Sequence, residues 1–213
     1  MLQVESFTLG PVMTNCYLIY HGETREALVV DPGTGPEEVL DRLKELELNV
    51  QAILLTHAHF DHIGGLESVR EKTGAPVYVH REEADWLESP DLNGSGLFPG
   101  LDPVRCGRAE HLLEGGEILS FLGQTFRVTH TPGHSPGSVS YALDSMVFSG
   151  DVLFAGSIGR TDLPGGDHAT LMRIIHDYMM ELPEETVVYS GHGPVTTIDR
   201  EQASNPFVTG MLD

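Results

Sequence analysis

The sequence predicts an α+β fold that forms one domain over residues 1–213. Three observations support this prediction. Short apolar runs rich in β-type residues recur along the chain, and several of them end beside glycine. Two stretches, one in each half, instead carry apolar residues at helical spacing. The length of 213 residues is sufficient for one domain with a substantial core.

The first helical stretch covers residues 36–46. It begins with proline and two glutamates, which suit the first turn because proline lacks the amide hydrogen that would go unpaired there. Its apolar residues follow helical spacing, at Val39, Leu40, Leu43 and Leu46. The next element is a β run at residues 52–55, which leads directly into a histidine-rich segment.

Residues 89–100 are rich in glycine, proline, serine, asparagine and aspartate, which predicts a loop. Such an insertion near a cleft is either a lid or an inert surface loop, and the sequence leaves both open.

The second half of the chain also combines β runs with a helix. Three β runs are expected near residues 125–129, 146–150 and 186–191. Between them Asp167 can cap a second helix, which ends before Pro183. One side of that helix is apolar, with Leu171, Ile174, Ile175, Tyr178, Met179 and Leu182.

Four candidate metal ligands lie within six residues, directly after the run at 52–55: His57, His59, Asp61 and His62. Imidazole and carboxylate are common donors for zinc, manganese and iron. In an extended segment His57, His59 and Asp61 would share one face, whereas in a coiled one His59 and His62 would lie together. A strand that turns into a helix here would divide the donors into two neighbouring groups.

Further donors occupy similar local positions. His134, Asp151 and His192 each follow a β-type run and lie beside glycine. These positions predict donors from several loops at one edge of a sheet. His130 ends the same run that precedes His134 but has no partner at matching spacing, so we interpret it as structural.

Taken in order, these motifs resemble the metallo-β-lactamase superfamily. The resemblance implies a four-layer αββα sandwich in which His57, His59 and His134 hold one metal ion. It likewise implies that Asp61, His62 and His192 hold a second ion and that Asp151 bridges the two. Within the superfamily, shorter motifs resemble the short glyoxalase-II-like branch of hydroxyacylglutathione hydrolases. These motifs are Asp31-Pro32-Gly33, Gly159-Arg160-Thr161-Asp162, Gly165-Gly166-Asp167 and Gly191-His192-Gly193-Pro194.

The activity that this resemblance implies is hydrolysis of a small-molecule thioester such as S-lactoylglutathione. Two divalent ions per chain, expected to be zinc with iron or manganese as alternatives, would supply a hydroxide at neutral pH. Asp61 and Asp151 would orient that hydroxide. Arg160 is the candidate substrate contact, although Asp162 is an equally suitable partner for it.

Other functions remain open at this point. A persulfide dioxygenase of the same superfamily would hold one iron with His57, His134 and Asp151, a two-histidine, one-carboxylate set. Lactonase and phosphodiesterase activities are less favoured but compatible with the site chemistry. A β-lactamase is less favoured because those enzymes usually place other ligands than Asp61, His62 and a bridging Asp151. A non-catalytic metal-binding module is disfavoured because all seven ligands are present.

The composition of the chain limits the kinds of binding partner that we expect. The formal charge of −20 disfavours nucleic acid, because phosphate backbones would be repelled. The sequence has no long apolar segment and no apolar leader after basic residues, so we expect a cytoplasmic protein that does not bind membranes. Cys16 and Cys106 are far apart and indicate neither a disulfide framework nor a thiolate site. A homo-oligomer remains possible.

Overall fold

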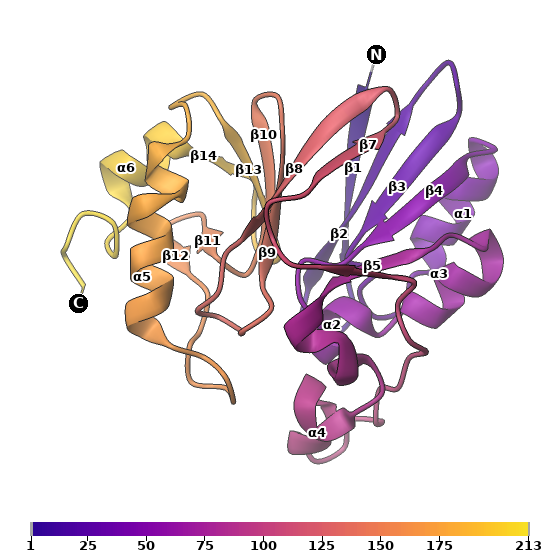
Figure 1. Cartoon of the computed structure of the whole chain (residues 1–213), viewed down its shortest axis with the longest axis horizontal. Coiled ribbons are helices and arrows are strands. Elements are labelled where there is room, and N and C mark those ends of the chain that lie inside the picture. Colours follow the sequence, from indigo (N-terminus) through magenta and orange to yellow (C-terminus); the bar gives the residue numbers. More distant parts are fainter. Residues whose placement is uncertain (1, 213) are drawn as a thin grey trace.

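Two six-stranded sheets pack face to face in the computed structural model, which describes residues 2–212, and helices cover their outer faces (Figure 1). This is the four-layer αββα sandwich, as predicted. Three clusters of buried apolar residues fill the spaces between successive layers. The cluster between the two sheets includes the fully buried rings of Phe126, Tyr141 and Phe148.

The first sheet has the strand order β1-β2-β3-β4-β5-β6. β1, β2 and β3 pair antiparallel, and β3 to β6 pair parallel. The strands are β1 (Leu2–Leu9), β2 (Thr14–His21), β3 (Glu26–Val30), β4 (Asn49–Leu54), β5 (Val77–His80) and β6 (His111–Leu113). β3 and β4 are buried almost throughout because both faces of this sheet are covered.

The second sheet has the order β14-β13-β10-β9-β8-β7, with one parallel pair, β10 and β13. Its strands are β7 (Ile118–Phe121), β8 (Gln124–His130), β9 (Val139–Leu143), β10 (Met146–Gly150), β13 (Val187–Ser190) and β14 (Thr196–Thr197). A small hairpin of β11 (Leu153–Phe154) and β12 (Ser157–Ile158) follows β10. The three β runs predicted in this half are therefore confirmed.

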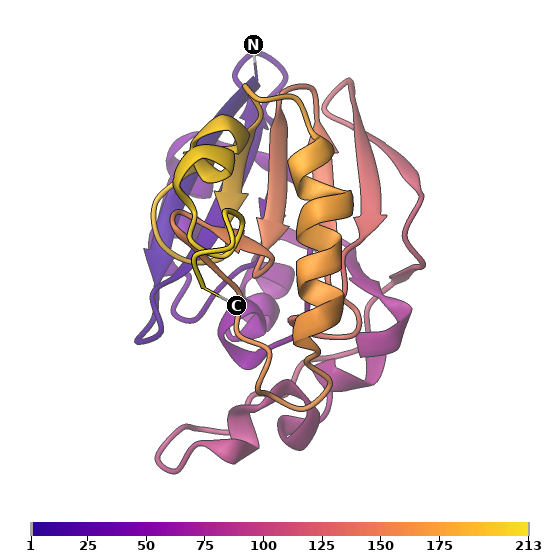
Figure 2. The same cartoon turned by 90° about the vertical axis from the view of Figure 1, so that its left-hand side faces the viewer.

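Helices complete the outer layers. α1 (Glu37–Glu45) and α3 (Leu66–Thr73) cover the first sheet, and Figure 2 shows α5 (His168–Asp177) along the outer face of the second, beside α6 (Ile198–Ser204). The remaining helical elements are short: α2 (Phe60–Ile63), α4 (Pro90–Asn93) and the 3-10 turns η1 (Arg81–Leu87), η2 (Ser95–Leu97) and η3 (Met179–Glu181). No helix within residues 2–212 is long and apolar enough to span a bilayer.

The two predicted helices differ in outcome. The first is confirmed, since α1 buries Val39 and Leu43 against the first sheet. The second begins as predicted, where the Asp167 carboxylate accepts a hydrogen bond from the Thr170 amide. It ends earlier than predicted, because the backbone leaves the α conformation at Tyr178, and a separate 3-10 turn then buries Met179.

The loop prediction for residues 89–100 was wrong in part, because this segment contains α4 and η2. Ser89 caps α4 through its hydroxyl, and Pro90 occupies the first turn, so the same residue types that indicate loops here begin a helix. Fully buried Asn93 anchors the segment by donating to the carbonyls of Trp86 and Val104. The segment is thus held by internal hydrogen bonds.

Candidate metal centre

The histidine-rich segment leaves β4 and turns into the short helix α2, which is the arrangement that divides its donors. His59 lies at the N-terminal boundary of α2 in an extended conformation, and Asp61 and His62 lie within the helix. His57 precedes the turn. The other three donors come from the second half: His134 follows β8, Asp151 follows β10 and His192 follows β13. The chain therefore delivers all seven residues to one end of the sandwich.

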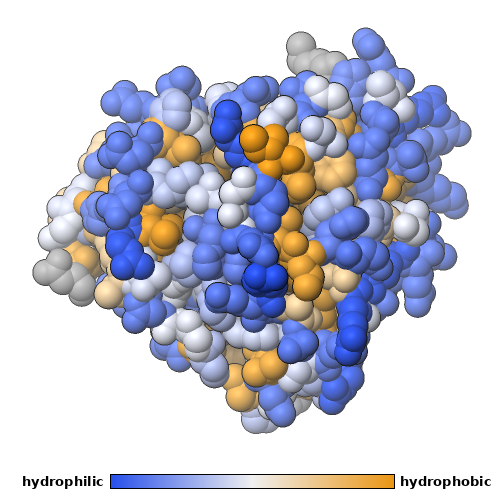
Figure 3. All heavy atoms as spheres, in the orientation of Figure 1, coloured by the Kyte–Doolittle hydropathy of each residue, from blue (hydrophilic) through white to orange (hydrophobic). Residues whose placement is uncertain are grey.

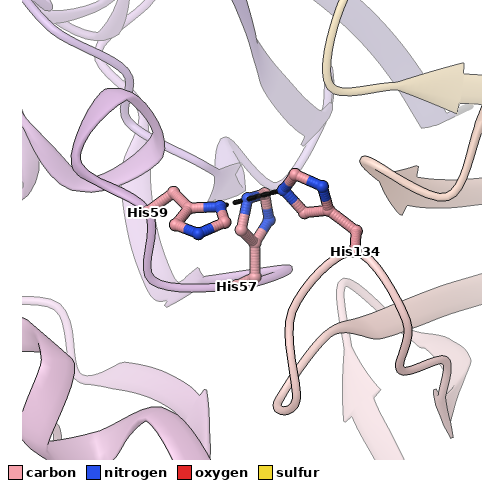
Figure 4. A group of neighbouring side chains, drawn as sticks. All are labelled: His57, His59 and His134. Carbon is pink, nitrogen blue, oxygen red and sulfur yellow. Dashed lines mark hydrogen bonds between the residues drawn. The ribbon is translucent and has the colours of Figure 1, made fainter. Parts of the chain in front are cut away.

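Three imidazoles form the first donor group, which Figure 4 shows pointing toward one another. His134 Nε2 lies 2.9 Å from His59 Nδ1 and 3.2 Å from His57 Nε2. All three side chains are buried. This spacing allows one ion to contact one nitrogen of each ring.

Asp61, His62 and His192 form the second donor group. The Asp61 Oδ2 atom lies 3.4 Å from His62 Nε2 and 3.3 Å from His192 Nε2. Asp151 lies between the two groups: one of its oxygens is 3.4 Å from His62 Nε2, and the other is 3.5 Å from both His134 Nε2 and His192 Nε2. The structure thus brings together every predicted ligand.

Burial and mutual charge shift the pKa values in this cluster. Desolvation, helped by the neighbouring imidazoles, lowers the pKa of His57 well below its ordinary value and that of His59 to about 3. For His62, burial opposes protonation, but the nearby carboxylates, led by Asp61, outweigh it and raise the pKa. Burial likewise disfavours the charged carboxylate of Asp151, yet His62 and His134 hold its pKa well below the usual range. The His57 and His59 imidazoles are therefore neutral, whereas the neighbouring Asp151 carboxylate keeps its charge.

Hydrogen bonds at the far ring nitrogens direct the lone pairs of these imidazoles inward. His134 Nδ1 lies 2.7 Å from the carbonyl oxygen of Arg160, so that nitrogen carries the proton and Nε2 faces the cluster as an acceptor. His62 Nδ1 likewise donates to the Asp31 carboxylate, at 2.9 Å. Both rings therefore turn their Nε2 atoms toward the cluster.

Two buried atoms in the cluster lack hydrogen-bond partners. Among residues 2–212, neither His62 Nε2 nor Asp151 Oδ1 makes a hydrogen bond. Unpaired buried polar atoms are costly and call for an explanation such as an ion. Together with the other imidazoles and the two carboxylates, these atoms form a donor set that fits divalent metal ions.

Buried carboxylates outside the cluster hold its two groups in place. Asp31 accepts hydrogen bonds from the Thr56 amide at 2.8 Å and the Thr56 hydroxyl at 2.6 Å, in addition to the one from His62. Fully buried Glu83, in η1, accepts the amide of Ala58 at 2.5 Å and that of Gly137 at 2.7 Å. Glu83 therefore ties the loop that carries His57 and His59 to the loop that carries His134.

β2 supports the remaining donors. The Thr14 hydroxyl donates to Asp61 Oδ2 at 2.6 Å. The Asn15 amide side chain donates to the carbonyls of Ser190 and Gly193, on either side of His192. These contacts fix the loop after β13 against the first sheet.

Sequence reasoning did not assign roles to these supporting residues. Asp31 entered the sequence analysis only as part of the Asp31-Pro32-Gly33 match, yet it follows a β run beside proline and glycine, a signal similar to the one that identified Asp151. The motifs give no comparable signal for Glu83 or Asn15. His130, interpreted as structural, stacks on His80 with ring centroids 4.2 Å apart and hydrogen-bonds the Pro136 carbonyl.

A cavity of about 330 Å³ opens above the cluster, with His59, Asp61, His134, Asp151 and His192 among its lining residues. Arg160 also lines it, but its guanidinium makes two 2.7 Å hydrogen bonds to the Asp162 carboxylate. Both predicted partners of Arg160, the cavity and Asp162, are thus present in the structure.

Comparison with known proteins agrees with this geometry. A family model described as the metallo-beta-lactamase superfamily matches residues 9–192. The chain belongs to the metallo-beta-lactamase superfamily. A relative from Haemophilus influenzae named hydroxyacylglutathione hydrolase GloC is 36% identical over 211 residues, which cover 97% of this chain and 98% of the relative.

Solved structures of superfamily members show the same fold. The structure of the BLEG-1 B3 metallo-beta-lactamase matches with a TM-score of 0.93 and 50% identity, covering 99% of this chain and all of that one. A structure of TTHA1623 in a di-iron-bound form matches with a TM-score of 0.82 and 40% identity, covering 95% and 99% of the two chains. Membership of this superfamily indicates a metal-dependent enzyme.

Proposed function

We propose that the protein is a binuclear metal-dependent hydrolase of thioesters, such as S-lactoylglutathione or a related acylglutathione. The observation that carries the proposal is the pair of adjacent donor groups, with Asp151 between them, that line an open cavity. The likeness to a hydroxyacylglutathione hydrolase over nearly the full length of both chains supports the choice of bond.

We assign His57, His59 and His134 to one ion, Asp61, His62 and His192 to the other, and Asp151 to both. Zinc is the expected metal, and the di-iron form of a structural neighbour makes iron the principal alternative. Bound divalent ions lower the pKa of a coordinated water to about 7 and polarise a carbonyl oxygen.

The side chains around the cavity would position the reactants. Asp61 is held by the Thr14 hydroxyl, so its carboxylate has a fixed direction in which to orient the attacking water. Asp151, unpaired at Oδ1, would serve in the same way. Neither cysteine of the chain lines the cavity, since Cys16 and Cys106 are buried elsewhere, so we propose direct attack by water on the thioester carbonyl.

The decisive experiment measures metal content and turnover on one sample, purified without added metal. About two metal ions per chain together with hydrolysis of S-lactoylglutathione is the expected result. His57→Ala should lose metal and turnover, whereas the control His176→Ala, on the exposed side of α5, should retain both. Full metal content and full turnover in His57→Ala would contradict the ligand assignment.

The same sample tests the dioxygenase alternative. One iron per chain with oxygen uptake dependent on glutathione persulfide would replace the hydrolase proposal. In that case His57, His134 and Asp151 would hold the iron.

A second candidate is β-lactam hydrolysis. It is favoured by the match to a metallo-beta-lactamase at 50% identity over 99% of this chain. Both reactions add water to a carbonyl carbon and expel a heteroatom, so the same donors would serve either. Turnover of a chromogenic cephalosporin at a higher kcat/KM than any thioester would make this candidate the primary activity.

A further inference from the structure

The wall of the cavity is chemically unlike its floor. The floor consists of the donor residues, whereas the wall consists of apolar side chains from four separate segments: Val12, Phe60, Phe98, Leu101 and Leu163. A site of this kind binds an apolar group through the wall and reacts with the polar group at its base.

The segment that follows η2 supplies two of these side chains, Phe98 and Leu101. The Phe98 ring is 40% exposed and contacts the Phe60 ring, with centroids 5.6 Å apart. Figure 3 shows hydrophobic atoms at the lower end of the molecule, where Figure 1 places α4. Phe98 is therefore part of a contiguous apolar lining, and an exposed apolar patch beside a candidate reactive site is typical of a ligand-binding groove.

The charges around the cavity do not favour a highly anionic ligand. Within residues 2–212, Arg160 is the single lysine or arginine that lines it. The bidentate contact to Asp162 already compensates that guanidinium. The carboxylates of glutathione would therefore find no free cation in the wall, so the thiol part of such a substrate is better placed outside the cavity.

We propose that the wall formed by Phe60, Phe98 and Leu101 binds the acyl group of the substrate and selects unbranched apolar acyl chains over the small, hydroxylated lactoyl group. This inference rests on the proposed thioester hydrolase function and names its substrate class. The thioester carbonyl lies at the donor cluster, the acyl chain lies along the wall, and the polar thiol carrier extends to solvent.

A series of thioesters of one thiol tests the proposal. With glutathione as the common thiol, kcat/KM should rise from S-acetyl through S-butanoyl to S-hexanoyl, by up to about fourfold per added methylene. S-hexanoylglutathione should exceed S-lactoylglutathione by at least about tenfold on the same basis.

Two variants assign the effect to the wall. Phe98→Ala and Leu101→Ala should flatten the chain-length dependence, with a larger loss for the hexanoyl than for the acetyl thioester. The matched control is Leu97→Ala, which removes a similarly exposed apolar side chain from the same segment but not from the cavity. It should leave the dependence unchanged.

A binding measurement provides a readout that needs no turnover. Trp86, the one tryptophan of the chain, has its ring 5.5 Å from that of His59 and should report occupancy through its fluorescence. S-alkyl-N-acetylcysteamine thioethers, which are neutral and cannot be hydrolysed, should bind more tightly as the alkyl chain lengthens. Phe98→Ala should remove that trend.

The outcomes separate the two proposals. Turnover of S-lactoylglutathione with no gain for longer acyl chains would overturn the acyl-wall inference and leave the thioester hydrolase intact. No turnover of any thioester by metal-loaded protein would overturn the hydrolase proposal, and the inference with it. A chain-length gain that Phe98→Ala and Leu97→Ala reduce equally would also overturn the assignment to the wall.

Discussion

Replacing Glu83 with glutamine should weaken metal binding at one donor group and spare the other. The Glu83 carboxylate accepts two buried amides, Ala58 N at 2.5 Å and Gly137 N at 2.7 Å. Glutamine keeps one acceptor oxygen but turns its side-chain amide NH2 toward the second backbone N–H, so two donors would face each other. The loops held together by this contact carry His57, His59 and His134, whereas Asp61, His62 and His192 have other supports.

The magnitude follows from the lost hydrogen bond. Leaving a buried donor without its acceptor costs about 1–3 kcal/mol of stability. For a chain of this length that corresponds to a fall in Tm of roughly 2 to 12 °C. Loss of a contact that orients metal ligands typically weakens metal affinity by about 10- to 100-fold. We expect that loss at the three-histidine group alone.

Competition with a chromogenic chelator resolves the two affinities. The wild type should show two binding steps, of which Glu83→Gln shifts one. Asp85→Asn is the matched control, since it makes the same chemical change at an exposed position of η1. Unchanged affinity at both steps would refute the role of Glu83, and an equal loss at both would indicate general destabilisation.

Three further outcomes are expected. Gly191→Ala places a Cβ against Asp151 Oδ1 and 2.8 Å from His62 Cε1, so elemental analysis should find at least one ion fewer per chain, whereas exposed Gly22→Ala should retain both. Removing the metal with a chelator should lower Tm by roughly 8 to 16 °C for each bound ion, relative to protein with metal at a thousandfold excess over the Kd of that site, and an unchanged Tm would contradict tight binding to the folded state. Arg42 depresses the pKa of Glu5 through two 2.8 Å hydrogen bonds, so Glu5→Gln should cost less than about 1 kcal/mol in urea unfolding. The pKa of Glu5 is lower in the folded than in the unfolded protein. The loss of unfolding free energy in Glu5→Gln should therefore be complete above the unfolded-state pKa of about 4.3 and disappear as the pH falls through the folded-state pKa. A loss that persists at pH 2 would contradict this ion pair's contribution.

The convergence of the seven candidate donors could be predicted because each of them lies in a local sequence pattern that can be recognised. Asp151 and His192 each follow the end of a strand and lie beside a glycine. Glycine is required at position 191 because a side chain there would collide with Asp151. The αββα layers required the family resemblance, because alternating short strands and helices suit several architectures.

The supporting residues could not be predicted in the same way. Glu83 accepts hydrogen bonds from the backbone amides of Ala58 and Gly137. Every residue except proline has such an amide, so the residue types at these two positions do not indicate that they contact Glu83. Phe98 is similar: the composition of residues 89–100 predicts a loop, and only the packing of Asn93 and the contact with Phe60 bring its ring to the cavity. Such roles depend on contacts between positions distant in the sequence.

Each donor group draws residues from both halves of the sandwich, and this has an energetic consequence. His57 and His59 follow the first sheet while His134 follows the second, and the second group likewise combines Asp61 and His62 with His192. Neither half contains a complete group, so an ion can bind tightly only when the two sheets are packed together. Metal binding and packing between the sheets must then stabilise each other, because each favours the same arrangement. Glu83 and Asn15, which cross the same junction without contacting an ion, would hold the halves in position before the metal arrives.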